Sequence, residues 1–295
     1  MKPAYKIMFF ISMALTVLAI ILIATFGLRL GIDFKGGTAI DLTFANSRPA
    51  SDNLAKIVGG IPGTSNVSIS PVGNNEALIR LNSINEQTHQ QILKDISTKF
   101  GKITENRFDS IGPTIGSELK SKSVSSIIIL LLAVIVYLAI VFRKLSKVLS
   151  PWAIGIAAVI ALIHDVVIPT GVFAILGHYY GIEITGVFVA AALTILGYSV
   201  SDSVVVFDRV RENVLRFGSR EDFGALVHKS IMQTLVRSIN TTLATLLSLI
   251  AVYFFGGESI KYFALALIIG IFSGAYSSIF IASPILVWWS RKSRI

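Results

Sequence analysis

Six long apolar stretches alternate along the chain with polar segments, and each is long enough to cross a lipid bilayer. A transmembrane helix needs about 20 apolar residues, because each residue advances the helix by about 1.5 Å. The first stretch is longer than the apolar core of a typical signal peptide and lacks a convincing small-residue cleavage site, so we expect a retained anchor. The pattern predicts spans at residues 7–27, 123–142, 152–176, 185–207, 233–255 and 261–289.

The one large polar segment, residues 28–121, has the periodicity of a small α/β domain. Its strands alternate or are β-branched, and Ile92 and Ile96 lie four residues apart in its second helix. The predicted elements are, in order, strand TAIDLTF, helix SDNLAKIVGG, strand NVSIS, strand EALIRL, helix NEQTHQQILKDISTKFG and strand ITENRFDSI. This β-α-β-β-α-β order is the ferredoxin-like plan. The segment contains no nucleophile–base pair and no ligand-spaced cluster, so we expect a binding or mechanical role.

The predicted fold class is therefore a polytopic α-helical membrane protein with six transmembrane helices and a small ferredoxin-like α/β extracytoplasmic domain. The expected organisation is a first helix at 1–27, the α/β domain at 28–121, a five-helix bundle at 122–290 and a cytoplasmic tail at 291–295. Composition agrees, since 53% of the 295 residues are apolar and only 15% are charged. The absence of cysteine excludes disulfides and thiolate chemistry.

The net charge of +9 is concentrated in a few connecting segments. Lys and Arg gather after spans two and four and at the C-terminus, whereas the GHYYGIEI loop has neither. The positive-inside rule then places both termini and both basic loops in the cytoplasm, and residues 28–121 on the outer face. We interpret the charge as a topology signal and expect no nucleic-acid partner. The residues that carry it are Lys2, Lys6, Arg143, Lys144, Lys147, Arg209, Arg211, Arg216, Arg220, Lys229, Arg291, Lys292 and Arg294.

An aspartate, Asp202, interrupts the fourth span within ILGYSVSDSVVVFDRVREN. It lies six residues before Asp208, which marks the cytoplasmic boundary, so its depth is roughly 9 Å. Arg237 lies at a similar depth in the fifth span, and we expect the two to pair directly or through water. Helical spacing places other polar residues on the same two faces: Thr194 and Tyr198 beside Asp202, and Asn240 and Thr241 beside Arg237.

Two interpretations of this pair remain open from the residues alone. Ionisable groups inside a membrane usually have a function, which favours a proton pathway through Asp202 and Arg237. The alternative is a structural ion pair that fixes the helix register, although desolvation offsets much of the attraction in such pairs. We expect Thr194 and Asn240 to pack and form hydrogen bonds rather than to relay protons.

A second candidate site is IHDVVIPTG in the third span, which holds His164 and Asp165 near the midplane. Adjacent helical residues point about 100° apart, so we expect these two side chains not to face one another. Asp165 either lines the proton pathway or bonds a neighbouring helix near Pro169. The glycine-rich GIDFKGG matches no phosphate-binding motif, and we expect it to form a tight turn. No cofactor, no metal and no catalytic residue is expected.

Five motifs resemble the SecF members of the SecD/SecF family, auxiliary subunits of the bacterial Sec protein translocase. They are GIDFKGG, IGPTIGSEL, HDV, GYSVSDSVVVFDRVREN and TLVRSINTTL, in the family's order across the whole chain. The resemblance implies half of a resistance-nodulation-division type membrane fold in the bacterial cytoplasmic (inner) membrane. It also implies that Asp202 and Arg237 take part in proton conduction, and that the chain is not an enzyme.

The implied partners are a SecD-like six-span subunit, the SecYEG channel with SecA, and an unfolded preprotein on the outer face. In this family the proton-motive force helps to draw preproteins outward. A half-size proton-coupled permease for a lipid or drug is the main alternative, and a passive translocon scaffold is a third. An exporter usually needs larger outer domains than residues 28–121 supply.

Overall fold

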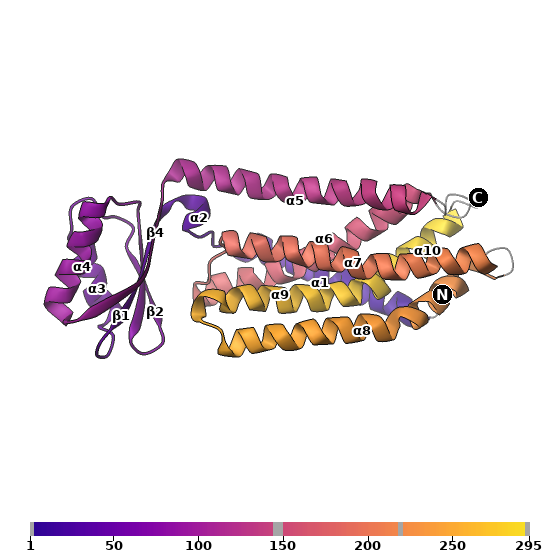
Figure 1. The fold of residues 1–295 in the computed structure, drawn as a ribbon. Coiled ribbons are helices and arrows are strands. Elements are labelled where there is room, and N and C mark those ends of the chain that lie inside the picture. The colour runs from indigo at the N-terminus through magenta and orange to yellow at the C-terminus, as the bar shows by residue number, and fades with distance from the viewer. Residues whose placement is uncertain (1–2, 144–149, 218–220, 293–295) are drawn as a thin grey trace. The chain divides into compact units, whose positions relative to one another are not determined.

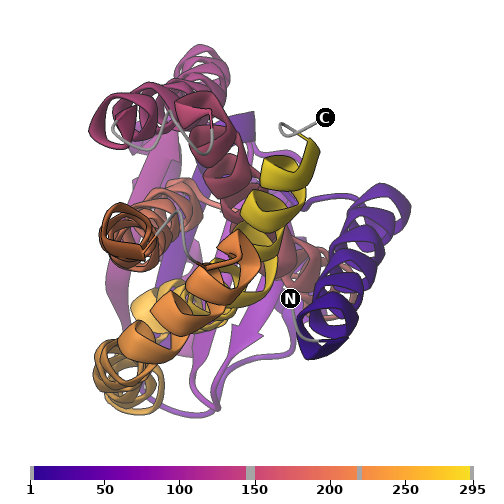
Figure 2. The ribbon, with the colours of Figure 1, turned by 90° about the vertical axis from the view of Figure 1, so that its right-hand side faces the viewer.

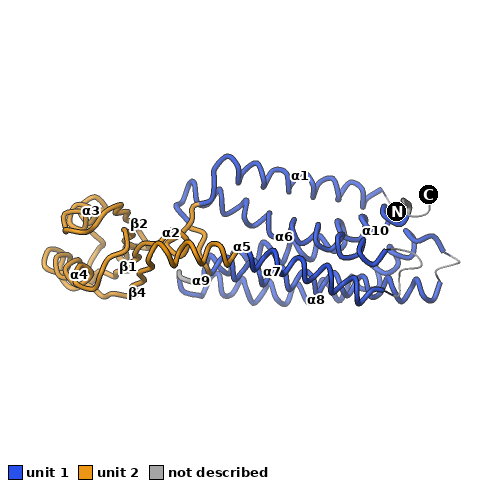
Figure 3. The backbone as a smooth tube through the Cα atoms, turned by 90° about the horizontal axis from the view of Figure 1, so that it is seen from above, with its two compact units in different colours: residues 1–28, 125–182, 187–295 blue, residues 29–124, 183–186 orange. Residues whose placement is uncertain are grey.

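The computed structural model describes residues 3–143, 150–217 and 221–292, and it divides into two compact units (Figure 3). Unit 1 comprises Met1–Leu28, Ser125–Ile182 and Val187–Ile295, and unit 2 comprises Arg29–Val124 and Glu183–Gly186. Residues Glu183–Gly186 thus belong with the α/β unit, although the sequence pattern assigned them to the membrane bundle. Of the predicted topology residues, Lys2, Lys144, Lys147, Arg220 and Arg294 lie outside the described residues.

Unit 1 is built from long helices (Figure 1). They are α1 (Pro3–Phe26), most of α5 (Pro113–Val141), α6 (Pro151–Tyr180), α7 (Gly186–Phe217), α8 (Phe223–Phe255), α9 (Glu258–Ser277), the π-helical turn η2 (Ser278–Ala282) and α10 (Ser283–Lys292). The last three form one continuous apolar span, Ile260–Ser290. Within the described residues six helices are long and apolar enough to cross a membrane, which confirms the prediction of six spans.

The helices of unit 1 differ in how deeply they are buried. In α6, α7 and the last span, 44–56% of the most apolar stretch is buried, against 11–17% in α1, α5 and α8. Figure 2 views the bundle end-on, with α1 at one side. The most buried helices are thus α6, α7 and the last span, and polar side chains between them are removed from lipid.

Several helices run beyond their predicted limits: α8 begins at Phe223 rather than at residue 233, and α5 and α7 each extend through a polar segment. α5 begins at Pro113 rather than at residue 123, and Glu118 bonds Lys122 one turn later at 2.6 Å. α7 continues past residue 207 to Phe217, where Asp208 bonds Arg211 at 2.8 Å. Oppositely charged residues three or four positions apart stabilise a solvated helix, so polarity alone did not end either one.

Unit 2 contains a four-stranded antiparallel sheet, two helices and one short helical turn. The order along the chain is α2 (Ile32–Lys35), β1 (Gly37–Phe44), α3 (Ser51–Gly59), β2 (Ser68–Val72), β3 (Glu76–Leu81), α4 (Glu86–Phe100) and β4 (Ile103–Ile111), and the order in the sheet is β2-β3-β1-β4. This β-α-β-β-α-β topology confirms the predicted α/β domain. Alternation along the strands turns Ile40 and Leu42 toward the helices, where they share one buried core with Leu54, Ile92 and Ile96.

Candidate functional site

Two aspartates are buried inside unit 1, Asp165 on α6 and Asp202 on α7. A carboxylate removed from water costs several kcal/mol unless it is neutralised or hydrogen-bonded. In the structure, serine hydroxyls of neighbouring helices donate hydrogen bonds to both carboxylates.

Asp202 accepts one hydroxyl hydrogen bond on each carboxylate oxygen. Ser238 of α8 donates to Oδ1 at 2.6 Å, and Ser278 donates to Oδ2 at 2.6 Å. All three side chains are buried. Asp202 thereby links α7 to α8 and to the start of η2.

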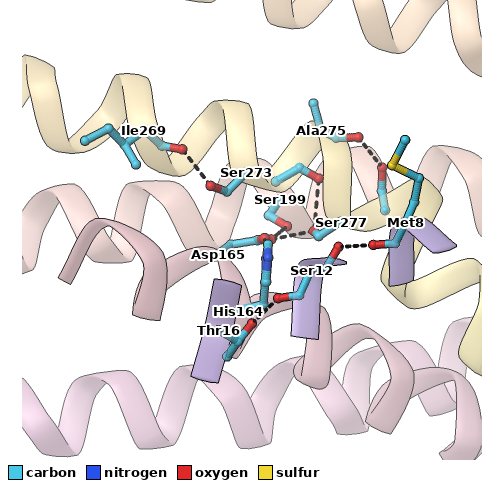
Figure 4. Close-up of polar contacts among 12 residues, drawn as sticks. Met8, Ser12, Thr16, His164, Asp165, Ser199, Ile269, Ser273, Ala275 and Ser277 are labelled. Atoms are coloured by element: carbon cyan, nitrogen blue, oxygen red, sulfur yellow. Dashed lines mark hydrogen bonds and ion pairs between the residues drawn. The ribbon is translucent and has the colours of Figure 1, made fainter. Parts of the chain in front are cut away.

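Asp165 is held in the same way by two other helices. Ser199 of α7 and Ser277 of α9 donate to its Oδ2 at 2.5 and 2.8 Å (Figure 4). The Nδ1 of His164 lies 2.9 Å from its Oδ1. The expectation that His164 and Asp165 do not face one another was therefore wrong, because side-chain torsions bring the tips together although the Cα–Cβ bonds diverge. Asp165 does bond neighbouring helices, as one of the two expectations for it had it, and its place in a proton pathway stays a prediction.

Arg237, the predicted partner of Asp202, is elsewhere. It immediately precedes Ser238 in α8, its side chain is exposed, and no hydrogen bond or ion pair joins it to Asp202 in the described part of the chain. Adjacent residues diverge by about 100° around a helix axis. The helix therefore presents Ser238, and not Arg237, to the buried aspartate.

The predicted supporting residues divide between two faces. Tyr198 reaches across to α8, where its hydroxyl donates to Thr242 Oγ1 at 3.3 Å. Thr194 and Thr241 are exposed and donate to carbonyls of their own helices, and Asn240 is exposed as well. The polar stripe predicted on α8 is therefore offset by one residue from the face that contacts α7.

Four serines that carry the site were missed as polar partners: Ser199, Ser238, Ser277 and Ser278. Serine is small and common at helix contacts, so none of the four stands out in the sequence as a partner of an aspartate. Gly270 and Gly274 do allow close approach, because a Cβ at either would lie within about 3 Å of α7 atoms. At Gly197 an added Cβ would meet no atom within 4 Å, so no close helix approach depends on this glycine. The sequence feature that could have indicated two of them is the consecutive pair Ser277 and Ser278 in the middle of an apolar span.

The GIDFKGG motif lies in unit 2 and bonds the other segment of that unit, Glu183–Gly186. Asp33 accepts a hydrogen bond from Gly186 N at 2.6 Å, and Gly31 N donates to Ile184 O at 2.8 Å. The motif forms the short helix α2 rather than the expected tight turn, and Gly36 and Gly37 adopt positive φ angles of 75° and 135°. An added Cβ at Gly36 would lie 2.7 Å from Pro113 Cα, so this position excludes larger residues.

Glu183 ties the same loop to the sheet by charge. It bonds Arg80 of β3 at 3.0 Å and lies 3.8 Å from Arg29. Burial raises the pKa of the Glu183 carboxyl, while the positive charges of Arg80, Arg29 and Lys35 oppose that rise. Among the described residues, no group of three His, Asp or Glu side chains is arranged to hold a metal ion.

Two family models match this chain. The one described as "Protein export membrane protein SecD/SecF, C-terminal" matches residues 91–292, and "SecD/SecF GG Motif" matches residues 21–47. The chain is 42% identical to the protein translocase subunit SecF of Thermobaculum terrenum, over 96% of this chain and 92% of that one. It is 39% identical to the SecF subunit of Anaerolinea thermophila, over 95% and 91%.

Solved structures of SecDF are also similar to this chain. The crystal structure of SecDF, a translocon-associated membrane protein from Thermus thermophilus, matches with a TM-score of 0.83 and 34% identity, covering 97% of this chain. SecDF in its super-membrane-facing form matches with a TM-score of 0.69 and 31% identity, covering 98%. In both cases this chain spans only 38% of the SecDF chain.

Proposed function

The chain belongs to the SecD/SecF family of protein export membrane proteins, and from that premise we propose that it is the SecF subunit of a protein translocase driven by the proton-motive force. In this role it promotes preprotein export by coupling proton movement through Asp202 to a conformational change. A member of an export family is a transport component and not an enzyme, in agreement with the sequence.

The buried carboxylate of Asp202 is the observation that supports this proposal most strongly. Both of its oxygens receive hydroxyl donors, from Ser238 and Ser278. Such a site stabilises the ionised form through two hydrogen bonds and accepts a proton without leaving a buried charge. Asp165, with Ser199 and Ser277, is a second carboxylate of the same construction and the next proton site that we propose.

In the proposed transport cycle, Arg237 promotes release of the proton from Asp202. Because Arg237 and Ser238 are successive residues of α8, a rotation of that helix exchanges which of them faces Asp202. A guanidinium beside the carboxylate favours its ionised form. We therefore assign proton loading to the state in which Ser238 faces Asp202, and release to the state in which Arg237 does.

The proposed partners follow from the family. A SecD-like six-span part completes a SecDF-type assembly, because the SecDF chains that this chain matches extend well beyond the matched 38%. The assembly acts with SecYEG and SecA on an unfolded preprotein at the outer face. The location is the bacterial cytoplasmic membrane, with both termini in the cytoplasm, as the basic loops indicate.

The test is a comparison of Asp202→Asn, Arg237→Met and Asp208→Asn in vesicles that carry the SecD partner. Preprotein export is measured with and without an imposed proton gradient. Asp208 is the matched control, because it lies on the same helix but its side chain is partly exposed and paired with Arg211. We expect the first two variants to export only at the level seen without a gradient, and Asp208→Asn to respond to the gradient like the unmodified chain.

Two other outcomes identify the alternatives. A passive scaffold requires all three variants to retain gradient-dependent export, which would contradict the proton role. A half-size permease requires drug or lipid efflux to change in Asp202→Asn while preprotein export does not. Within the described residues, no feature of the structure favours either alternative.

A further inference from the structure

Two consecutive serines connect the two buried aspartates. Ser277 ends α9 and donates to Asp165 Oδ2 at 2.8 Å, and Ser278 begins η2 and donates to Asp202 Oδ2 at 2.6 Å. Both serines are fully buried. The side chains of two successive residues therefore bond both carboxylates, which lie on different helices.

Each of these hydroxyls also has a second acceptor within reach. Ser277 Oγ lies 3.1 Å from Gly274 O, and Ser278 Oγ lies 3.1 Å from Ala275 O, each three residues earlier in the same helix. A hydroxyl carries a single proton and donates it to one acceptor at a time, while its oxygen accepts from others. Within the described residues, Ser199 and Ser238 have only their carboxylates as acceptors.

Resting on the proposed proton role of Asp202, we propose that Ser277 and Ser278 are positioning residues that act as a paired hydroxyl switch. While a carboxylate is ionised, its serine donates to it. When the carboxylate takes up a proton, the new acid O–H donates to the serine oxygen, and the serine O–H turns to its own helix carbonyl. Every polar group then keeps a partner in both states, so the buried site changes charge without the cost of an unsatisfied donor.

The π-helical turn supplies the coupling between the two sites. η2 extends over Ser278–Ala282 and precedes Pro284, whose missing N–H removes the donor that an α-helix would offer to Phe280 O. In the same turn, Ser283 Oγ donates to another carbonyl, Ser278 O, at 2.8 Å. Single π-helical turns are frequent at functional sites. Because Ser277 and Ser278 are neighbours at its edge, a change of donor at one carboxylate shifts the backbone that holds the other.

The other ionisable groups around Asp165 and Asp202 are few among the described residues. On the helices packed against them they are Tyr5 on α1, His164 on α6, Tyr198 on α7, Arg237 and His228 on α8, and Tyr276 on α9. Tyr5 lies against Phe280 of η2 and bonds His228, and of these groups His164 alone contacts either carboxylate in the described structure. Tyr276 donates instead to Met8 O. A shift in pH dependence on changing Ser278 therefore reports on Asp202 itself.

The experiment compares Ser277→Ala, Ser278→Ala, their combination, and Ser278→Thr, which restores a hydroxyl. Ser273→Ala is the matched control, because Ser273 is buried one turn earlier on α9 and its hydroxyl donates only to Ile269 O, at 2.8 Å (Figure 4). Gradient-driven preprotein export by the SecD–SecF complex is measured as a function of pH, with Asp202→Asn as the inactive reference. Infrared spectroscopy of the purified complex follows the carboxyl C=O band that Asp202→Asn removes.

We expect either alanine variant to move the midpoint of the pH profile by about one unit and to shift the carboxyl band. Ser278→Thr should restore both, and Ser273→Ala should change neither. The double variant should fall short of the sum of the single effects, because the two residues act as a unit. If either alanine variant lowers the yield of the complex, the position of the carboxyl band in the protein that remains tests the switch.

The switch is overturned if both alanine variants keep the original midpoint and band while Asp202→Asn abolishes gradient-driven export. That result leaves the proposed function intact. If Asp202→Asn itself exports normally, the proposed function fails first.

Discussion

At the scale of single residues, Asp165 and Asp202 are held by hydroxyl groups rather than by a guanidinium, and this decides what the two sites can do. An arginine is always protonated and only donates, so a permanent partner of that kind keeps a carboxylate ionised. A serine donates to an ionised carboxylate and accepts from a protonated one. Each such bond contributes about 1 kcal/mol or more, which suits a carboxylate that has to change its charge.

Asp41 in unit 2 is the opposite case, a carboxylate whose surroundings disfavour its ionised form. Its Oδ1 is buried without a hydrogen-bond partner, and burial, followed by repulsion from Glu76, raises its pKa. The folded state then binds a proton more readily than the unfolded state, so stability falls as pH rises from the unfolded value through the raised one. We predict that Asp41→Asn stabilises unit 2 at pH 7 and gives little benefit near pH 4.

Amide hydrogen exchange of β1 and β3 in the full-length protein at the two pH values measures this effect. Asp109→Asn is the control, because Asp109 is paired with Arg107 on the neighbouring strand β4. Equal protection of Asp41→Asn and the unmodified chain at pH 7 would contradict the prediction.

At the scale of elements, close helix contacts depend on individual glycines rather than on a general stripe of small residues. A Cβ added at Gly171 of α6 would lie 2.7 Å from Ala19 Cβ and 2.9 Å from Ala19 Cα of α1. The backbone of α1 has to move to accept it. At Gly197 of α7 an added Cβ meets no atom within 4 Å.

We therefore predict that Gly171→Ala destabilises the α1–α6 contact by about 1–3 kcal/mol. Gly197→Ala should be neutral or stabilising by up to about 1 kcal/mol, because alanine favours the helix. Thermal unfolding of both variants in detergent measures the difference. A fall in Tm for Gly197→Ala equal to that of Gly171→Ala would show that packing at Gly171 is not the cause.

At the scale of the whole molecule, α8 has an exposed face that is too polar to be covered by lipid alone. Its outward residues combine apolar Leu243 with the polar Arg237 and Asn240, all inside a membrane span. A charged side chain facing hydrocarbon is costly, and such groups usually face a protein or a hydrated path. The exposed side chains in the middle of α5, such as Ile128, are apolar and suit lipid.

We predict that a photocrosslinking residue at Leu243 captures the SecD-like subunit in native membranes and that one at Ile128 does not. The two positions are matched in exposure, at 52% and 51%. Crosslinked products are identified by mass. Capture from Ile128 but not from Leu243 would place the partner against α5 and contradict the argument from α8.

The sequence by itself determined the six spans, the α/β unit and the presence of two aspartates at membrane depth. These features depend on local properties: the length of an apolar run, the period of a strand or helix, and a charge where none is expected. The strands EALIRL and ITENRFDSI were predicted to the residue for the same reason.

Only the tertiary structure decided which partners the aspartates have. A one-residue step around α8 changes the direction of a side chain by about 100°, and the packing of whole helices selects Ser238 over Arg237 to meet Asp202. The pairing of Ser277 with Asp165 likewise depends on contacts between residues 112 positions apart. Such contacts follow from the rotation of each helix about its axis, which no local pattern specifies.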